Sequence, residues 1–112
     1  MLLGACLTEP SLLIAIDIVE AKLDLARRLG ATHVIHGLNQ DPAAVIFDLT
    51  QGKGVDYSIE AAGQRKAMEQ AFRVVRETGG LCVLAGNLPA GDLISIDPFS
   101  LIKGKRSLEK AS

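Results

Sequence analysis

The chain has 112 residues, of which 48% are hydrophobic and 22% are charged, with 11 glycines, 4 prolines and no tryptophan. A chain of this length and composition folds as one domain with its own core, which excludes a disordered protein and a two-domain protein. Twelve basic and thirteen acidic residues give a net charge of −1. This balance argues against the basic face of a general nucleic-acid binder and against a polybasic membrane-surface protein.

Neither the apolar runs nor the cysteines indicate a membrane protein or an oxidising compartment. The longest apolar runs are shorter than the roughly 20 residues that span a bilayer. Cys6 and Cys82 are too few for a disulfide scaffold and lack the spacing of a CxxC motif. We therefore expect a cytoplasmic protein with reduced thiols and no membrane partner.

Short apolar runs alternate with amphipathic segments along most of the chain. Residues 12–17 are apolar up to Asp17, which is typical of a strand covered on both faces. Residues 20–29 contain strong helix formers and are followed by Gly30, which suits a helix C-cap. In chain order we predict strand 12–17, helix 20–29, strand 32–36, helix 42–50, strand 55–61, helix 64–78, strand 81–85, strand 93–96 and a short helix 99–103.

This order of elements predicts an α/β fold. Strands that alternate with helices form a parallel sheet with right-handed crossovers, and repeating units of about 25 to 30 residues fit βαβ construction. We therefore expect a parallel sheet with flanking helices.

Asp17 is the most informative single residue, because it stands at the carboxyl end of a buried strand and just before a helix. Ligands of doubly wound sheets bind outside the carboxyl ends of the strands. A carboxylate in that place can accept both hydroxyl hydrogens of an adenosine ribose and repels a 2′-phosphate, which favours NAD over NADP. The alternative, that Asp17 merely caps the following helix, carries equal weight from its position alone.

Small residues follow two of the later predicted strands. Residues 61–63 are Ala-Ala-Gly, and residues 86–87 are Gly-Asn. Small side chains let a flat cofactor approach the backbone. A tight turn is the commoner reason for glycine in such a loop, so both interpretations stay open.

Several catalytic and binding motifs are absent. A Rossmann half begins with a strand and a GxGxxG turn at a helix N-terminus, and no such element precedes Asp17. Residues 52–54, Gly-Lys-Gly, follow a helix instead of a strand, so they do not replace it. His33 and His36 point to opposite faces of a strand, and neither cysteine has a partner at zinc spacing. No serine lies in a GxSxG motif, so we predict neither a metal site nor a catalytic residue.

The following segments occur in order along the chain: residues 14–18 with Lys22, residues 29–32, residues 54–63, Gly79-Gly80, residues 86–91, Asp97-Pro98 and residues 103–106. This ordered set resembles the cofactor domain of zinc-type medium-chain alcohol dehydrogenases. The resemblance implies a partial Rossmann-like parallel sheet with flanking helices, from which the first strand and the glycine-rich turn are missing. It implies a single partial dinucleotide-binding domain over residues 1–112, with a match to the family that ends near residue 106.

The resemblance also implies roles for individual residues. Two match positions that contact the adenosine ribose, two match apolar positions beside the cofactor, and three match the segment near the nicotinamide. These implied NAD-binding residues are, in that order, Asp17 and Lys22, Ala61 and Ala62, and Ala85, Gly86 and Asn87. Asn87 departs from the apolar residue that is usual there. The edge strand formed by Leu93, Ile94, Ser95 and Ile96 is implied to pair with its twin in a homodimer.

Parts of the family pattern have no counterpart in the sequence. The catalytic domain with its zinc ligands and proton relay is missing, so zinc is implied for the parent family only. Residues 1–7 resemble the tail of the helix that follows the glycine turn. Without the first strand, residues 12–18 and 55–61 would each expose an apolar edge. The two halves would then close up and pair directly, or the chain would be marginally stable.

Three functional hypotheses follow. The first is a fragment of an NAD-dependent, zinc-type alcohol dehydrogenase, whose parent family transfers hydride between an alcohol and nicotinamide. We expect no turnover from this chain alone. The second hypothesis is a non-catalytic dimerisation or binding module. The third is another nucleotide-binding α/β domain, such as a methyltransferase-like fold, which also places an acid after a second strand to hold a ribose.

Overall fold

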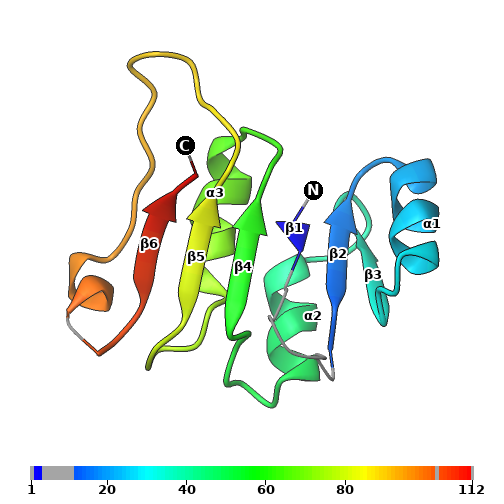
Figure 1. Ribbon diagram of the computed structural model, residues 1–112, viewed down its shortest axis with the longest axis horizontal. Coiled ribbons are helices and arrows are strands. Elements are labelled where there is room, and N and C mark those ends of the chain that lie inside the picture. The colour runs from blue at the N-terminus through cyan, green and yellow to red at the C-terminus, as the bar shows by residue number, and fades with distance from the viewer. Residues whose placement is uncertain (1, 4–11, 103, 112) are drawn as a thin grey trace.

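A six-stranded sheet flanked by helices forms the molecule (Figure 1). The computed structural model describes residues 2–3, 12–102 and 104–111. In chain order the elements are β1 (Leu2–Leu3), β2 (Ile14–Asp17), α1 (Glu20–Arg28), β3 (His33–His36), α2 (Pro42–Leu49), β4 (Tyr57–Glu60), α3 (Arg65–Arg73), β5 (Leu81–Leu84), the 3-10 helix η1 (Pro98–Leu101) and β6 (Ser107–Lys110).

The strand order across the sheet is β3-β2-β1-β4-β5-β6, which is the order of a dinucleotide-binding Rossmann sheet. The pairs β2–β3, β4–β5 and β5–β6 are all parallel. These pairs and the flanking helices confirm the predicted α/β fold. Because β1 runs antiparallel to both β2 and β4, these two strands point the same way and their carboxyl ends lie at one edge of the sheet.

The expectation for the amino-terminal residues was wrong where the structure describes them. Leu2 and Leu3 form a strand, not the tail of a helix, and they lie between β2 and β4, so the two halves neither separate nor pair directly. Without β1, the backbone groups on the facing edges of β2 and β4 would have no partner, and an extended segment between the two strands can pair with both. Parallel pairing needs a crossover of about a dozen or more residues, so a segment this close to β2 in sequence pairs antiparallel.

The three α-helices begin within one residue of the predicted positions, α1 and α2 end one residue early, and α3 ends five residues early. α2 starts after Asp41, whose side chain accepts a hydrogen bond from the Ala43 amide. α3 ends at Arg73 instead of residue 78. The reason is a tertiary contact, because the Val55 amide donates to the Val74 carbonyl at 2.8 Å and the chain pairs as a short bridge there.

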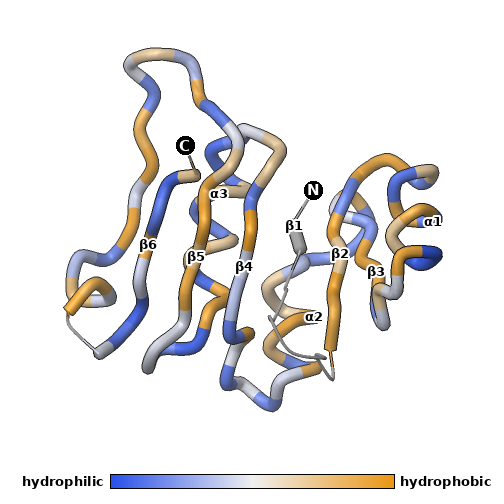
Figure 2. The backbone as a smooth tube through the Cα atoms, viewed as in Figure 1, coloured by the Kyte–Doolittle hydropathy of each residue, from blue (hydrophilic) through white to orange (hydrophobic). Residues whose placement is uncertain are grey.

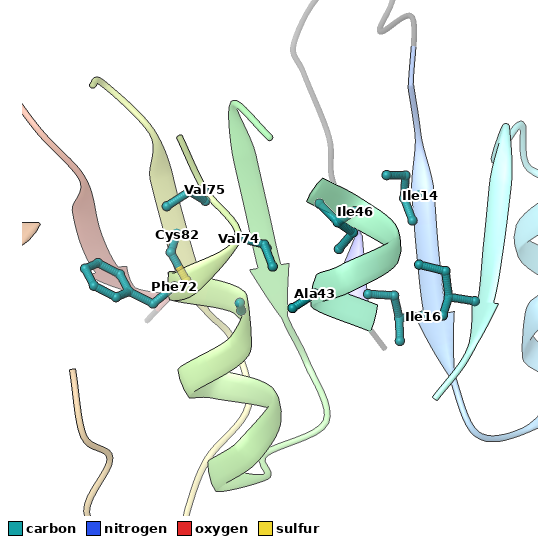
Figure 3. Close-up of a cluster of buried hydrophobic side chains, with 10 residues drawn as sticks. Ile14, Ile16, Ala43, Ile46, Phe72, Val74, Val75 and Cys82 are labelled. Carbon is teal, nitrogen blue, oxygen red and sulfur yellow. The ribbon is translucent and has the colours of Figure 1, made fainter. Parts of the chain in front are cut away.

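One apolar cluster fills the space between the sheet and the helices α2 and α3, which cover the same face (Figures 1 and 3). α1 packs against β2 and β3 and buries Leu23 and Ala26 outside that cluster. None of the helices in the described residues is long and apolar enough to cross a membrane. The buried members of the cluster are Ile14, Ile16, Ile35, Ala43, Ile46, Ala71, Phe72, Val74, Val75 and Cys82.

The outer edge beside β5 differs from the prediction. Residues 93–96 are not a strand in the single chain, and Ser107–Lys110 takes the position next to β5 as β6. A strand needs a hydrogen-bonded neighbour, and β6 already occupies the free edge of β5. β6 is largely hydrophilic (Figure 2), as expected for an edge strand that must avoid pairing with other chains. The predicted helix 99–103 is the 3-10 turn η1, which Asp97 caps at the Phe99 amide.

Candidate functional site

The carboxyl ends of β2, β4 and β5 form the candidate site, on both sides of β1, where the strand order reverses direction. Asp17 ends β2, and its Oδ1 atom accepts a hydrogen bond from the Val19 amide at 2.9 Å. The N-cap residue of α1 is Val19, which makes no side-chain cap hydrogen bond. Asp17 therefore forms a turn at the strand end, two residues before the N-cap residue of α1.

Lys22 lies on the first turns of α1, close in sequence to Asp17, and is exposed. Its amide donates to the Val19 carbonyl at 3.1 Å, which fixes the backbone of that turn. α1 leaves the sheet directly after β2, so its first turn starts at the same edge as Asp17. Both residues predicted to contact the ribose thus lie at the carboxyl edge of β2.

The loops after β4 and β5 contact each other directly. A Cβ atom added to Gly86 would lie 2.2 Å from the Gly63 amide nitrogen, and one added to Gly63 would lie 2.6 Å from the Asn87 carbonyl oxygen. Gly63 also has a φ of +71°, a conformation that favours glycine. Glycine is therefore required at both positions because the two backbones approach each other closely. A tight turn alone does not explain these glycines.

The alanines of these two loops are exposed at the same edge. Ala61 and Ala62 follow β4, and Ala85 follows β5. β2 and β4 are two strand positions apart, which is roughly 10 Å at the usual strand spacing. Asp17 and the alanine loop after β4 therefore lie on opposite sides of β1, about two strand spacings from each other.

Asn87 is exposed and has a partner that the sequence analysis missed. Its Oδ1 atom accepts a hydrogen bond from Lys110 Nζ at 2.7 Å, and the same ammonium group lies 3.4 Å from the Gly86 carbonyl oxygen. Lys110 belongs to β6, which was not predicted as a strand. A polar residue at position 87 is explained by this contact, which ties the loop after β5 to the edge strand.

Glu60 is the second functional candidate that the sequence analysis missed. It is the last residue of β4 and only 1% exposed, and its Oε1 atom accepts a hydrogen bond from the Gly63 amide at 2.6 Å. Its Oε2 atom is buried and has no hydrogen-bond partner among the described residues. The signal in the sequence is an acid between Ile59 and Ala61 at the end of a predicted strand. Acidic side chains are almost never fully buried unless they are paired, so an acid in this position indicates a specific role.

A cavity of about 450 Å³ lies between α3 and the segment before β6, and its lining includes Lys66, Arg73 and Arg106 but neither Asp17 nor the two glycine loops. Within the described ranges, no group of three or more His, Cys, Asp or Glu side chains is arranged to hold a metal ion. The pyrophosphate-binding turn of a Rossmann fold has no counterpart in these ranges either.

Comparison with known proteins decides the family. The sequence model of the zinc-binding dehydrogenases matches residues 12–112. The chain belongs to the zinc-binding dehydrogenase family. Alcohol dehydrogenase class-3 of Oryza sativa subsp. japonica is 36% identical over 104 residues, and S-(hydroxymethyl)glutathione dehydrogenase of Synechocystis is 36% identical over 105 residues. These matches confirm the resemblance to the zinc-type alcohol dehydrogenases.

Solved structures of zinc-binding dehydrogenases share the fold. Benzyl alcohol dehydrogenase from Acinetobacter calcoaceticus superposes with a TM-score of 0.81 at 34% identity, over 90% of this chain and 27% of that one. A protein described as a zinc-binding dehydrogenase from Sinorhizobium meliloti, bound to NADP, gives 0.82 at 27% identity, over 94% of this chain and 31% of that one.

The chain spans only part of the zinc-binding dehydrogenases that it matches. It covers 27% of the rice protein and 28% of the cyanobacterial one, while 91% and 92% of its own length takes part in these matches. The matched part is the region that contains the parallel sheet and the candidate site. The activity of the whole relatives is therefore a matter for proposal.

Proposed function

We propose that this chain forms the NAD-binding part of a zinc-type alcohol dehydrogenase and has no turnover of its own. The supporting observation is Asp17 at the carboxyl end of β2 in a sheet of order β3-β2-β1-β4-β5-β6. In the parent family the nicotinamide cofactor accepts or donates a hydride while zinc polarises the alcohol oxygen. In this proposal the strand ends supply the edge of the sheet that binds the cofactor. The described residues contain no group of three or more side chains arranged to hold a zinc ion.

Each predicted residue has a binding role that fits its position. The Asp17 carboxylate would accept the two hydroxyl hydrogens of the adenosine ribose, and Lys22 would contact the same sugar from the first turns of α1. On the other side of β1, Ala61 and Ala62 would leave room for the cofactor, and Ala85 and Gly86 would let the backbone approach the nicotinamide ring. The ammonium of Lys110 holds Asn87 through its side-chain oxygen and thereby orients the loop beside that ring.

The proposal includes a preference for NAD over NADP. Asp17 would repel a 2′-phosphate, because two negative groups would meet at one ribose. The NADP bound in the Sinorhizobium meliloti structure shows that the fold of that protein accepts the phosphate. In this proposal the side chain at the end of β2 selects between the two cofactors.

Calorimetric titration with NADH, NADPH and S-adenosylmethionine tests this proposal. We expect the wild-type chain to bind NADH in preference to the other two, and Asp17→Ala to weaken NADH binding about tenfold, as loss of a charge-assisted hydrogen bond does. Asp24→Ala removes the same charge from an exposed site on α1 where it pairs with Arg27, and should leave binding unchanged. Preferential binding of S-adenosylmethionine would support a methyltransferase-like domain, and no binding of NADH would reject the proposal.

A second candidate function is assembly, which the exposed apolar residues near η1 favour. Leu93 is 77% exposed and Phe99 is 71% exposed, and residues 93–96 form no strand within the single chain. We propose that this segment pairs with its copy in a homodimer, since an unpaired apolar segment gains backbone hydrogen bonds and buried area by doing so.

Light scattering tests the dimer. Ile94→Lys places a charge in the proposed interface and should shift the chain from dimer to monomer. Leu38→Lys is the matched control, because Leu38 is 74% exposed and follows β3 at the opposite end of the sheet. A wild-type chain that stays monomeric at all concentrations would exclude the homodimer.

A further inference from the structure

We infer that Glu60 is a positioning residue that holds the loops after β4 and β5 at the spacing that the nicotinamide half of the cofactor needs. The inference rests on the proposed dinucleotide-binding function and deepens it. Glu60 does not itself touch the cofactor in this proposal. It acts through Gly63 and Gly86, whose backbones approach each other closely where the two loops meet.

The burial of the Glu60 carboxylate is the first observation. The residue is 1% exposed, and the hydration that its charge loses must be replaced by hydrogen bonds. Only one replacement is seen in the described residues, the 2.6 Å bond from the Gly63 amide to Oε1, while Oε2 has none. An apolar residue would serve stability at least as well in a position that only needed filling. The carboxylate therefore has a task at this strand end.

Glu60 contacts both loops at once. Its side chain accepts from the Gly63 amide in the loop after β4. Its backbone carbonyl accepts from the Ala85 amide at 2.7 Å and from the Gly86 amide at 3.1 Å in the loop after β5. A single residue at the end of β4 thus fixes the start of one loop through its carbonyl and the end of the other through its carboxylate.

The unpartnered oxygen occupies the space that Gly86 leaves. A Cβ atom on Gly86 would lie 2.9 Å from Glu60 Oε2, 2.2 Å from the Gly63 nitrogen and 2.6 Å from the Gly63 Cα atom. Carboxylate, Gly63 and Gly86 therefore form one tightly packed unit, which we call the loop clamp. Its geometry sets the distance between Ala61-Ala62 on one side and Asn87 on the other.

The clamp acts on one side of the candidate site only. It joins the loops after β4 and β5, whereas Asp17 ends β2 on the far side of β1, roughly 10 Å away. Loss of the clamp should therefore weaken contacts to the nicotinamide half of a dinucleotide and leave contacts to the adenosine half intact. A general loss of stability would weaken both halves alike, so the two explanations differ in a measurable way.

Calorimetry with NADH and with ADP-ribose, which lacks the nicotinamide, compares the two halves. Glu60→Gln keeps the shape and an acceptor for the Gly63 amide but places an amide nitrogen where an unpartnered oxygen lies. We expect it to weaken NADH binding about tenfold and ADP-ribose binding less than about twofold. The reason is that a change in the clamp displaces only contacts to the nicotinamide half, which ADP-ribose lacks. Glu69→Gln makes the same charge change on α3, away from the clamp, and should alter neither. Equal losses for both ligands in Glu60→Gln, or no loss, would overturn the inference.

Amide hydrogen exchange followed by NMR tests the clamp without a ligand. In the wild-type chain the Gly63 amide should exchange slowly although it lies in a loop, while the amide of the exposed Gly91 exchanges fast. Fast exchange at Gly63 would overturn the clamp even if Glu60→Gln failed to fold. If the wild-type chain bound neither NADH nor ADP-ribose, the proposed function would fail, and the exchange rate of Gly63 would still decide the clamp.

Discussion

Cys82 lies fully buried in β5, within the apolar cluster that joins the sheet to α2 and α3. Burial raises the pKa of its thiol, a hydrogen bond with Ser58 lowers it by less, and the charge of Glu60 adds a smaller rise. The folded chain therefore keeps the thiol proton to a higher pH than the unfolded chain, in which a cysteine has a pKa of about 8.5. Unfolding above that pH releases a proton.

This proton release predicts how stability depends on pH. The stabilisation linked to the raised pKa is fully present below about pH 8.5 and is lost as the pH rises toward the folded-state pKa, by at most about 1.4 kcal/mol per pH unit. Cys82→Ala should remove this slope in urea titrations under reducing conditions. Cys6 is common to both chains, so its titration cancels in the difference. Identical pH slopes of the two chains would contradict the argument from burial.

At the scale of the elements, α2 and α3 begin in different ways. Asp41 caps α2 by accepting a hydrogen bond from the Ala43 amide at 3.2 Å, and a proline follows it at the first helical position. Gln64 occupies the N-cap of α3 without a side-chain hydrogen bond. The cap of α2 therefore stabilises its helix locally, whereas α3 depends on the core face that Met68, Ala71 and Phe72 bury.

This difference predicts unequal effects of two alanine substitutions. Asp41→Ala should lower the free energy of unfolding by about 1 kcal/mol, the usual value for loss of an N-cap. Gln64→Ala should leave it unchanged, because no cap bond is lost. Urea unfolding of both variants at one pH makes the comparison, and equal losses would show that the cap of α2 adds nothing.

At the scale of the whole molecule, β1 joins two halves that are otherwise separate sheets. β2 and β3 form one half, and β4, β5 and β6 form the other. Leu2 pairs with Ile16 on one side and Glu60 on the other, so this short strand lies next to the Glu60 end of the candidate site. The cooperativity of unfolding should therefore depend on a strand of two residues.

Proline in β1 tests this dependence. Leu3→Pro removes an amide from the centre of the sheet and should lower the free energy of unfolding by about 3 kcal/mol. It should also let the amides of β2 and β3 exchange independently of those of β4 and β5. Arg65→Pro is the control, since proline is tolerated at the first position of a helix such as α3. Unchanged cooperativity in Leu3→Pro would show that the halves hold together without β1.

Much of this molecule was predictable from local sequence. β2 and β5 are short, mostly apolar runs between turn residues, Gly30 marks the end of α1, and Asp41 with the following proline marks the start of α2. Asp17 was placed correctly at a strand end because an acid closing an apolar run must reach the surface of the sheet. That it binds a ribose stays a prediction.

Other features were decided only by tertiary structure. The end of α3, the pairing of β1 and the choice of β6 over residues 93–96 as edge strand all depend on which backbone groups are left unpaired nearby. The burial of Glu60 and the contact of Gly63 with Gly86 join residues of different loops. Periodicity within a segment is set by its own side chains, so the sequence determined the elements and the strand-end acid. Pairing and close approach depend on segments distant along the chain, so only the folded molecule could decide them.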